Sequence, residues 1–371
     1  MSEPLVTVVT PFYNSAPYLA ECIESVLAQS YQRFEYILSD NCSTDGSSEI
    51  AEKYSRLDSR IRLIRQSRML TQVEHYNSAL AVISDESQFC KMVQADDAIF
   101  PECLKEMAKA FQISESIGLV SAFDLKAGIV RGSGFPYPQS TVSGREIARH
   151  YLRTGLPLFG SPTTVMYRSA VVRSTKPFFE ESLLHEDTEK CMQILELWDF
   201  GFVYQVLSFL RVDDISISAG SRDFQPSALD HYIVVRRYAP KFCEAWESSQ
   251  LIRKSKRAYY RVLAHKAIKS PDRAFWEYHR NGLKTLDETI DWPYLLLWVM
   301  GELLVAITNP GTTIARAFRL LKSKTGQKGE HSQENANRES ARCVCKEGHG
   351  RSVQSDCGVP AAHKYGNPGG P

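Results

Sequence analysis

Apolar and polar residues follow two alternating patterns over the first third of the chain. Short apolar runs rich in β-branched residues predict strands buried on both faces, and apolar residues spaced three and four apart predict amphipathic helices. The predicted strands span residues 5–10, 34–39, 61–65, 89–94 and 117–122. The predicted helices between them begin near Pro17, Gly46, Gln72 and Pro101. Strands that alternate with helices of this length indicate an α/β fold with a parallel, doubly wound sheet.

The pattern changes beyond residue 125, where a Gly- and Pro-rich loop is followed by a helix predicted near 187–198 and a strand near 202–212. Residues 226–288 have a helical pattern rich in Arg and Lys. After about residue 323 the chain contains no Leu, Ile, Phe, Met or Trp, so it cannot bury enough apolar surface and is predicted to be disordered. The predicted organisation is a domain over residues 1–220, a helical C-terminal region over 221–322 and a disordered tail over 323–371.

Composition narrows the class of protein. The chain has 371 residues, of which 43% are hydrophobic, so it can bury a large core. Its net charge of +1 provides no strong field for nucleic acid, and we expect no nucleic-acid partner. Six of the nine cysteines are scattered singly through the folded part, which indicates reduced thiols in a cytoplasmic protein. The N-terminus has neither the basic region nor the apolar stretch of a signal peptide.

Residues 292–308 form a strongly apolar segment that includes Glu302. A membrane-spanning helix needs ~20 apolar residues, so this segment is marginal for crossing. The basic residues that follow it favour the cytoplasmic side. Two interpretations remain open. The segment either lies on the cytoplasmic membrane surface with the basic residues of 253–261, as a peripheral anchor, or packs as a buried helix on the first domain.

Carboxylates follow two of the predicted strands, at the edge where doubly wound sheets bind ligands. Asp40 either accepts a hydrogen bond from a base or ribose, or serves only its own loop and the next helix start. Asp96 and Asp97 are adjacent after a buried strand. Such a pair fits a hard divalent cation that also binds phosphates. The structural alternative is that Asp97 caps the helix beginning near Pro101.

Two more acidic clusters follow later in the chain. Glu186 and Asp187 precede a predicted helix, where acids either complement the helix dipole or act as a general base toward a hydroxyl. Arg211 and Asp213 follow a predicted strand, and their structural alternative is an ordinary charged turn.

The chain resembles the family 2 glycosyltransferases in three stretches. These are "VTVVTPFYNSAPYLAECIESVLAQSYQRFEYILSDNCSTDGS", "KMVQADDAIFPECLKEM" and "HEDTEKCMQILELWDFGFVYQVLSFLRVDDISIS". The resemblance covers roughly residues 4–220. It implies a GT-A-type doubly wound, mostly parallel sheet, with a Rossmann-like nucleotide-binding half and an acceptor half. It also implies inverting transfer of a sugar from a nucleotide-diphosphate sugar.

The resemblance implies donor-binding roles for residues at the ends of the first, second and fourth predicted strands. Thr10, Pro11 and Tyr13 match the first loop, which lines the nucleotide base. Asp40 matches the acid that contacts the base or ribose, and Asp96 the acid that contacts the donor ribose or sugar.

The resemblance also implies a catalytic base and a divalent metal, Mg²⁺ or Mn²⁺. Asp187 matches the base, with Glu186 supporting it. Asp97 matches the metal ligand, Asp213 stands where a second ligand is expected, and Arg211 supports this position.

The implied reaction transfers a sugar, with a UDP-sugar favoured, to a hydroxyl of a saccharide or lipid-linked acceptor in cell-surface polysaccharide synthesis. Two departures from the family pattern bear on it, because Gln94 replaces the first acid of an Asp-x-Asp-Asp motif and Asp213 replaces a histidine. They leave a catalytically impaired scaffold subunit as an alternative. A sugar nucleotidyltransferase is a weaker alternative, since "TPFYNSAPY" lacks the glycines and basic residues of a triphosphate-binding loop.

Overall fold

The computed structural model describes residues 3–308 except for 136, 157, 160, 182–185, 213–223 and 270–271. The chain divides into one unit over residues 1–301 and a second from residue 302 onwards. Asp213 and the predicted tail over 323–371 lie outside the described residues.

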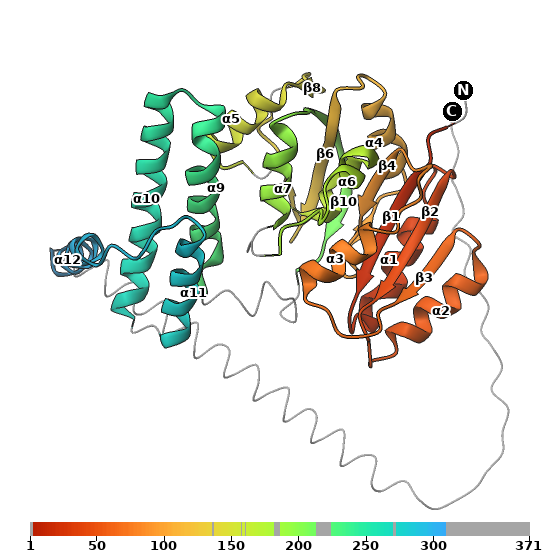
Figure 1. The fold of residues 1–371 in the computed structure, drawn as a ribbon, viewed down its shortest axis with the longest axis horizontal. Helices are drawn as coiled ribbons and strands as arrows, with labels where there is room; N and C mark the ends of the chain where they lie inside the picture. The colour runs from red at the N-terminus through yellow and green to blue at the C-terminus, as the bar shows by residue number, and fades with distance from the viewer. Residues whose placement is uncertain are drawn as a thin grey trace, which may run out of the picture. The chain divides into compact units, whose positions relative to one another are not determined.

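A ten-stranded mixed sheet forms the centre of the first unit (Figure 1). Eight strands lie in the order β3-β2-β1-β4-β9-β6-β10-β5, while β7 pairs with β6 and β8 with β10. The strands are β1 (Val6–Phe12), β2 (Phe34–Asp40), β3 (Ile61–Arg65), β4 (Phe89–Met92), β5 (Ala98–Ile99), β6 (Ile117–Lys126), β7 (Ile129–Arg131), β8 (Thr141–Val142), β9 (Val165–Arg168) and β10 (Asp199–Leu210).

The predicted α/β class and all five predicted N-terminal strands are confirmed. β3, β2, β1 and β4 are parallel neighbours, and β6 is parallel to β10. The parallel order is interrupted within the sheet, because β9 lies between β4 and β6 and is antiparallel to both. The short strands β5, β7 and β8 also pair antiparallel with their neighbours. β9 has four residues, too few for a strand period to stand out in the sequence.

Two apolar layers cover the two faces of the sheet, because successive strand residues point to opposite sides. Val8 packs in a cluster with residues of α1 (Ala16–Leu27), α2 (Ser47–Leu57) and α4 (Cys103–Phe111). Val9 packs in the other cluster, on the opposite face. That cluster includes residues of α3 (Gln72–Leu80), α5 (Gly144–Thr154), α6 (Ser169–Ser174), α7 (Glu186–Leu195) and α9 (Pro226–Phe242).

The predicted helical region contains α9, α10 (Ala245–Ile268), α11 (Arg273–Lys284) and α12 (Trp292–Thr308). Residues of α9, α10 and α11 form a third apolar cluster that also includes Leu295 of α12. Val234 and Tyr238 of α9 belong instead to the cluster on the sheet, so α9 contacts both. Among the described residues, no helix is both long and apolar enough to cross a membrane.

Cysteines of the described chain are thiols, as predicted. Six cysteines lie among the described residues; five of them are buried, and Cys42 is half-buried.

Candidate active site

The carboxyl ends of the central parallel strands meet at one edge of the sheet. Phe12 of β1 lies beside Asp40 of β2, and the N–H of Val93, just after β4, donates to the carbonyl of Val9 over 2.9 Å. This pairing places three of the predicted donor-binding segments, after β1, β2 and β4, side by side at the edge.

Asp97 lies in a tight turn after β4 and is only 4% exposed. Its N–H donates to the carbonyl of Gln94 over 3.0 Å. The hydroxyl of Thr163 donates to Oδ2 of Asp97 over 2.6 Å, and the N–H of Arg211 donates to Oδ1 over 3.0 Å. The N-cap position of α4 is occupied by Glu102, five residues after Asp97, so the helix-capping alternative for Asp97 is wrong.

Burial raises the pKa of Asp97 to about 7, and the adjacent Asp96 carboxylate adds to the increase. Three groups oppose it by favouring the ionised form: the Thr163 hydroxyl, the N–H of Arg211 and, at longer range, the Lys126 ammonium. A desolvated acid beside a like charge is the environment in which a bound cation stabilises the ionised carboxylate most.

Arg211 holds the acid pair from the end of β10. Its Nε donates to the carbonyl of Asp96 over 3.0 Å, and its Nη2 pairs with Glu21 of α1 at 2.6 Å. Its guanidinium lies 4.6 Å from the ring centre of Tyr18. A planar guanidinium can make these contacts together because its donors form a rigid fork. Arg211 therefore joins β10, α1 and the turn after β4.

The first loop and the end of β2 present fewer free polar groups than the sequence suggests. The hydroxyl of Thr10 is buried and lies 2.9 Å from the hydroxyl of Tyr36, and Pro11 is buried. Asp40 accepts hydrogen bonds from the N–H of Ser43 in its own loop and from the hydroxyl of Ser48 in the first turn of α2. Tyr13 is 47% exposed, so its ring is available at the edge.

The predicted base lies on a different element from the acid pair. α7 begins at Glu186, and Asp187 accepts a hydrogen bond from the N–H of Thr188 over 2.5 Å. Burial raises the pKa of Tyr151 on α5 to about 12, and the Asp187 carboxylate adds to the increase.

The side chain of Gln94, which replaces the first acid of the family motif, makes its hydrogen bond to α3. Its Nε2 donates to the hydroxyl of Tyr76 on α3 over 3.1 Å, while its N–H donates to Thr163 Oγ1 over 3.1 Å. Asp213, the other departure from the family pattern, lies outside the described residues.

Sequence reasoning missed Thr163, Glu21 and Tyr18. Thr163 lies in the short helix η1 (Pro162–Thr164), within a loop whose sequence carries no catalytic pattern. Glu21 and Tyr18 are on α1, where the apolar spacing draws attention to the opposite, buried face. Only their contacts with Asp97 and Arg211 identify them.

The acid pair fits a hard divalent cation. Each oxygen of Asp97 accepts one hydrogen bond, and a carboxylate oxygen has two lone pairs, so both retain a position for a ligand. Within the described residues, no group of three or more His, Cys, Asp or Glu side chains gathers as a metal site. A cation of the Mg²⁺ type takes one or two carboxylates, which Asp96 and Asp97 would supply, and fills its remaining positions with phosphates and water.

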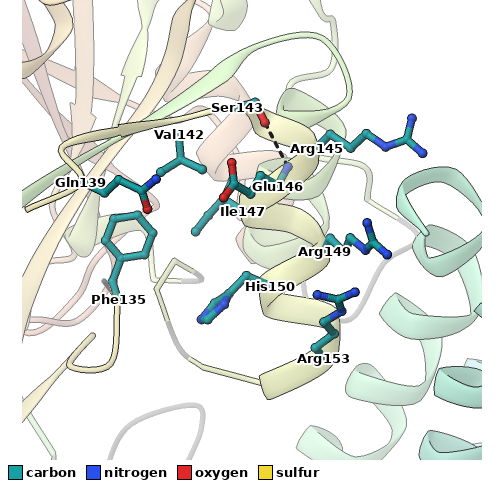
Figure 2. Close-up of a pocket in the computed structure, with 10 residues that line it drawn as sticks. All are labelled: Phe135, Gln139, Val142, Ser143, Arg145, Glu146, Ile147, Arg149, His150 and Arg153. Carbon is teal, nitrogen blue, oxygen red and sulfur yellow. Dashed lines mark hydrogen bonds between the residues drawn. The ribbon is translucent and has the colours of Figure 1, made fainter. Parts of the chain in front are cut away.

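A separate cavity of about 330 Å³ lies along α5 and includes none of the predicted site residues (Figure 2). Phe135, Gln139 and His150 line one side of it, and three arginines of α5 project from the other. Two of these arginines, Arg149 and Arg153, pair with Glu247 of α10. These two ion pairs therefore connect α5 to α10.

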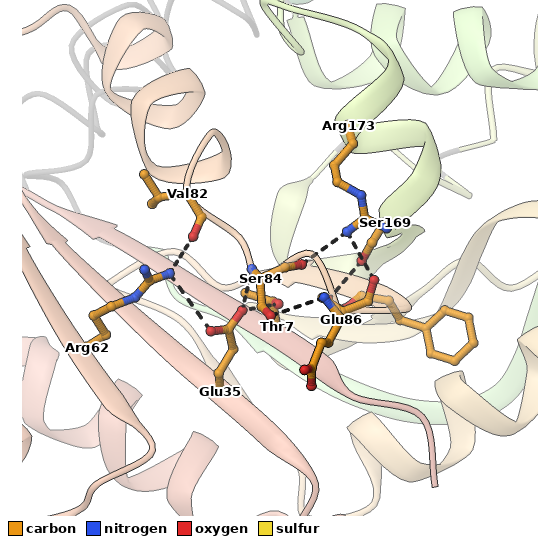
Figure 3. A network of polar contacts seen from close by, with 10 residues as sticks. Thr7, Glu35, Arg62, Val82, Ser84, Glu86, Ser169 and Arg173 are labelled. Carbon is orange, nitrogen blue, oxygen red and sulfur yellow. Dashed lines mark hydrogen bonds and ion pairs between the residues drawn. The ribbon is translucent and has the colours of Figure 1, made fainter. Parts of the chain in front are cut away.

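The opposite edge of the sheet shows how carboxylates are used structurally (Figure 3). Glu35 accepts hydrogen bonds from the hydroxyl of Thr7 over 2.6 Å and from the N–H of Ser84 over 2.8 Å, and it lies 3.8 Å from Arg62. Arg173 donates to the carbonyl of Ser84 over 3.1 Å. Glu35 therefore has Arg62 as a cationic partner, whereas the residue adjacent to Asp97 is a second acid, Asp96.

Comparisons with known proteins show which fold and which sequences this chain is similar to. The crystal structure of Staphylococcus aureus TarS 1–349 in complex with UDP-GlcNAc matches with a TM-score of 0.51 at 20% identity, over 69% of this chain and 72% of that chain. The fold is therefore of the GT-A type. Residues 7–174, slightly less than half of the chain, match the family described as Glycosyl transferase family 2.

Two curated relatives have overlapping matches. The glycosyltransferase GlyG of Streptococcus pneumoniae serotype 4 is 31% identical over 140 residues, which is 38% of this chain and 42% of that protein. The poly(ribitol-phosphate) β-N-acetylglucosaminyltransferase TarS of Staphylococcus aureus is 30% identical over 186 residues, 48% of this chain and 30% of that protein. The chain thus matches less than half the length of these relatives.

Proposed function

We propose that this protein is an inverting, metal-dependent glycosyltransferase. It takes a sugar from a nucleotide-diphosphate sugar, with a UDP-sugar favoured, and transfers it to a hydroxyl of a saccharide or lipid-linked acceptor. The observation that carries the proposal is the buried Asp97 carboxylate, held by Thr163 and Arg211 beside Asp96 at the ligand-binding edge of the sheet.

The donor would lie along this edge. Tyr13 lines the base, Asp40 contacts the base or ribose, and Asp96 contacts the ribose or sugar. Asp97 would hold the divalent cation, with Asp213 as a second ligand. When bound, that cation offsets the charge that develops on the diphosphate.

The chemical step is a single displacement. The acceptor hydroxyl oxygen bonds to the anomeric carbon from the face opposite the diphosphate, and the bond to the diphosphate oxygen breaks with its electron pair. Asp187 takes the hydroxyl proton as general base, which is typically worth ~10²–10⁴-fold in rate. One displacement inverts the anomeric centre.

The relatives support a role in cell-surface polysaccharide synthesis. TarS, by its name, transfers N-acetylglucosamine to poly(ribitol-phosphate), a polymer that presents many hydroxyls. We extend this role to the present chain as part of the proposal, with the sugar and the linkage left to experiment.

Calorimetric titration tests the proposal. UDP, dTDP and GDP, each with and without Mn²⁺, are titrated into wild type, Asp97→Asn and Asp58→Asn. Asp58 pairs with Arg60 at the turn before β3, so its variant is a matched control for loss of one carboxylate. We expect metal-dependent binding of one nucleotide, lost in Asp97→Asn and kept in Asp58→Asn. A folded wild type that binds none of them would contradict the proposal and favour the scaffold alternative.

We propose further that the protein acts at the cytoplasmic face of a membrane, bound to its surface through α12. Leu296 and Leu297 of α12 are 58% and 66% exposed, and Trp292 and Met300 are also exposed. Residues 253–284 contain ten Arg or Lys and two Asp or Glu, which suits an anionic surface. Exposed apolar side chains with a neighbouring cationic region are typical of interfacial helices.

Sedimentation with vesicles tests this location. Phosphatidylcholine vesicles with and without phosphatidylglycerol are mixed with wild type, a Leu296→Ser/Leu297→Ser variant and a Leu57→Ser control. Leu57 is 72% exposed on α2, so its loss matches the chemistry at another site. We expect binding to the anionic vesicles, reduced by salt and by the double variant only. A wild type that remains in the supernatant, or self-associates through these leucines, would contradict the proposal.

A further inference from the structure

Thr163 makes two hydrogen bonds that fix the direction of its hydroxyl proton. The N–H of Gln94 donates to Thr163 Oγ1 over 3.1 Å, so the oxygen uses a lone pair there. The hydroxyl has one proton, and Oδ2 of Asp97 lies 2.6 Å away as its acceptor. Thr163 is fully buried, so water does not compete for either bond.

The buried ammonium of Lys91 holds the segment that carries Thr163. Nζ of Lys91, in β4, donates to the carbonyl of Thr163 over 2.7 Å and lies 3.3 Å from the carbonyl of Val165. Lys91 is fully buried, and its contacts join β4 to η1 and to the first residue of β9. The Thr163 backbone therefore has little freedom to move relative to the strand that leads to Asp97.

The Asp97 carboxylate is held at both oxygens by groups from different elements. Thr163 donates to Oδ2 from η1, and the N–H of Arg211 donates to Oδ1 from the end of β10. A carboxylate bonded at both oxygens cannot rotate about its terminal torsion without breaking one bond. Outer hydrogen bonds of this kind orient metal ligands and affect their affinity.

We propose that Thr163 is a positioning residue, which orients Asp97 so that its remaining lone pairs face the donor diphosphate and its cation. Lys91 supports this role by holding the Thr163 backbone. The inference rests on the proposed function, because it assigns Thr163 a part in the donor site.

Three variants separate positioning from packing. Thr163→Val keeps the shape and removes the hydroxyl, whereas Thr163→Ser keeps the hydroxyl. Thr164→Val is the matched control, because the Thr164 hydroxyl donates to the carbonyl of the nearby Ser161 over 2.9 Å. Each variant is titrated with UDP plus Mn²⁺ by calorimetry and with Mn²⁺ alone by electron paramagnetic resonance, after its melting temperature is measured.

We expect Thr163→Val to weaken both affinities about 10- to 100-fold, the usual effect of losing a hydrogen bond to a charged group. Thr163→Ser and Thr164→Val should stay close to wild type. Equal losses in Thr163→Val and Thr164→Val, or wild-type affinity in Thr163→Val, would overturn the inference. If wild type binds Mn²⁺ but no nucleotide, the proposed function fails, and the Mn²⁺ titration alone decides the positioning role.

Discussion

The N–H of Arg211 donates to Oδ1 of Asp97 over 3.0 Å, although 114 residues separate the two in the chain. The bond links the end of β10 to the turn after β4. Since the Arg211 side chain also binds the carbonyl of Asp96 and the carboxylate of Glu21, one residue sets the position of both acids.

Replacement of Arg211 by lysine should weaken donor binding. The backbone bond to Asp97 remains, but a single ammonium cannot reach the Asp96 carbonyl and Glu21 together while lying over Tyr18. We expect the Kd for UDP with Mn²⁺ to rise about tenfold, which is a loss of ~1.4 kcal/mol. Arg60→Lys is the control, because Arg60 also forks around a carboxylate but at the turn before β3. An unchanged Kd in Arg211→Lys would show that the backbone bond alone holds the pair.

Loss of the Arg237 guanidinium should destabilise the fold near α7. Arg237 donates to both oxygens of the buried Glu189 carboxylate over 2.7 and 2.8 Å. Burial raises the pKa of Glu189 and Arg237 opposes the increase, so removing the arginine leaves a desolvated acid unpaired. Breaking such a pair from one side costs ~3 kcal/mol.

Urea unfolding of Arg237→Met, Glu189→Gln and the double variant measures this effect. We expect the double variant to be more stable than Arg237→Met, because it removes the unpaired charge. Similar stabilities for the double variant and Arg237→Met would mean that the arginine acts through packing.

Stability should fall as the pH decreases from 7 to 5, in part because of His75. Burial lowers the pKa of His75 to about 4, and the Asp40 carboxylate and Ser39 only partly oppose the change. The unfolded chain binds a proton near the ordinary pKa of ~6.5 while the folded chain does not, so folding loses roughly 2 kcal/mol across this window. The contribution of the neutral His75 to stability is fully present above the pKa that His75 has in the unfolded chain.

Urea unfolding of wild type and His75→Gln at both pH values measures the His75 contribution. Burial also lowers the pKa of His279 to about 4, so the variant should keep part of the pH slope. A slope equal to that of wild type would exclude His75 as a source.

Addition of one methyl group at Gly144 should destabilise the protein severely. A Cβ there would lie 2.1 Å from the carbonyl oxygen of Trp198 and 2.3 Å from that of Leu195, and backbone atoms cannot rotate away. Gly301→Ala is the control, because a Cβ at Gly301 meets nothing within 4 Å. It should leave stability unchanged or raise it by ~0.5–1 kcal/mol through helix propensity. Melting curves of the two variants compare them, and a folded Gly144→Ala at wild-type stability would refute this reading of the packing.

The sequence predicted the α/β class, the first five strands and the helices between them, because both faces of this sheet are buried and its helices have one apolar face. It also identified Asp40, Asp96 and Asp97 as acids at strand ends, since parallel strands bring their carboxyl ends to one edge. These features depend on local periodicity, which a single sequence shows directly.

Only the tertiary structure decided what surrounds those acids. Thr163 and Arg211 reach Asp97 from segments that are distant in the chain, and β9 enters the sheet with too few residues to show a period. Lys91 is buried although lysine ordinarily prefers solvent, because two carbonyls accept hydrogen bonds from its ammonium. Contacts of this kind depend on how separate elements pack, and packing between distant segments leaves no periodic signal in the sequence.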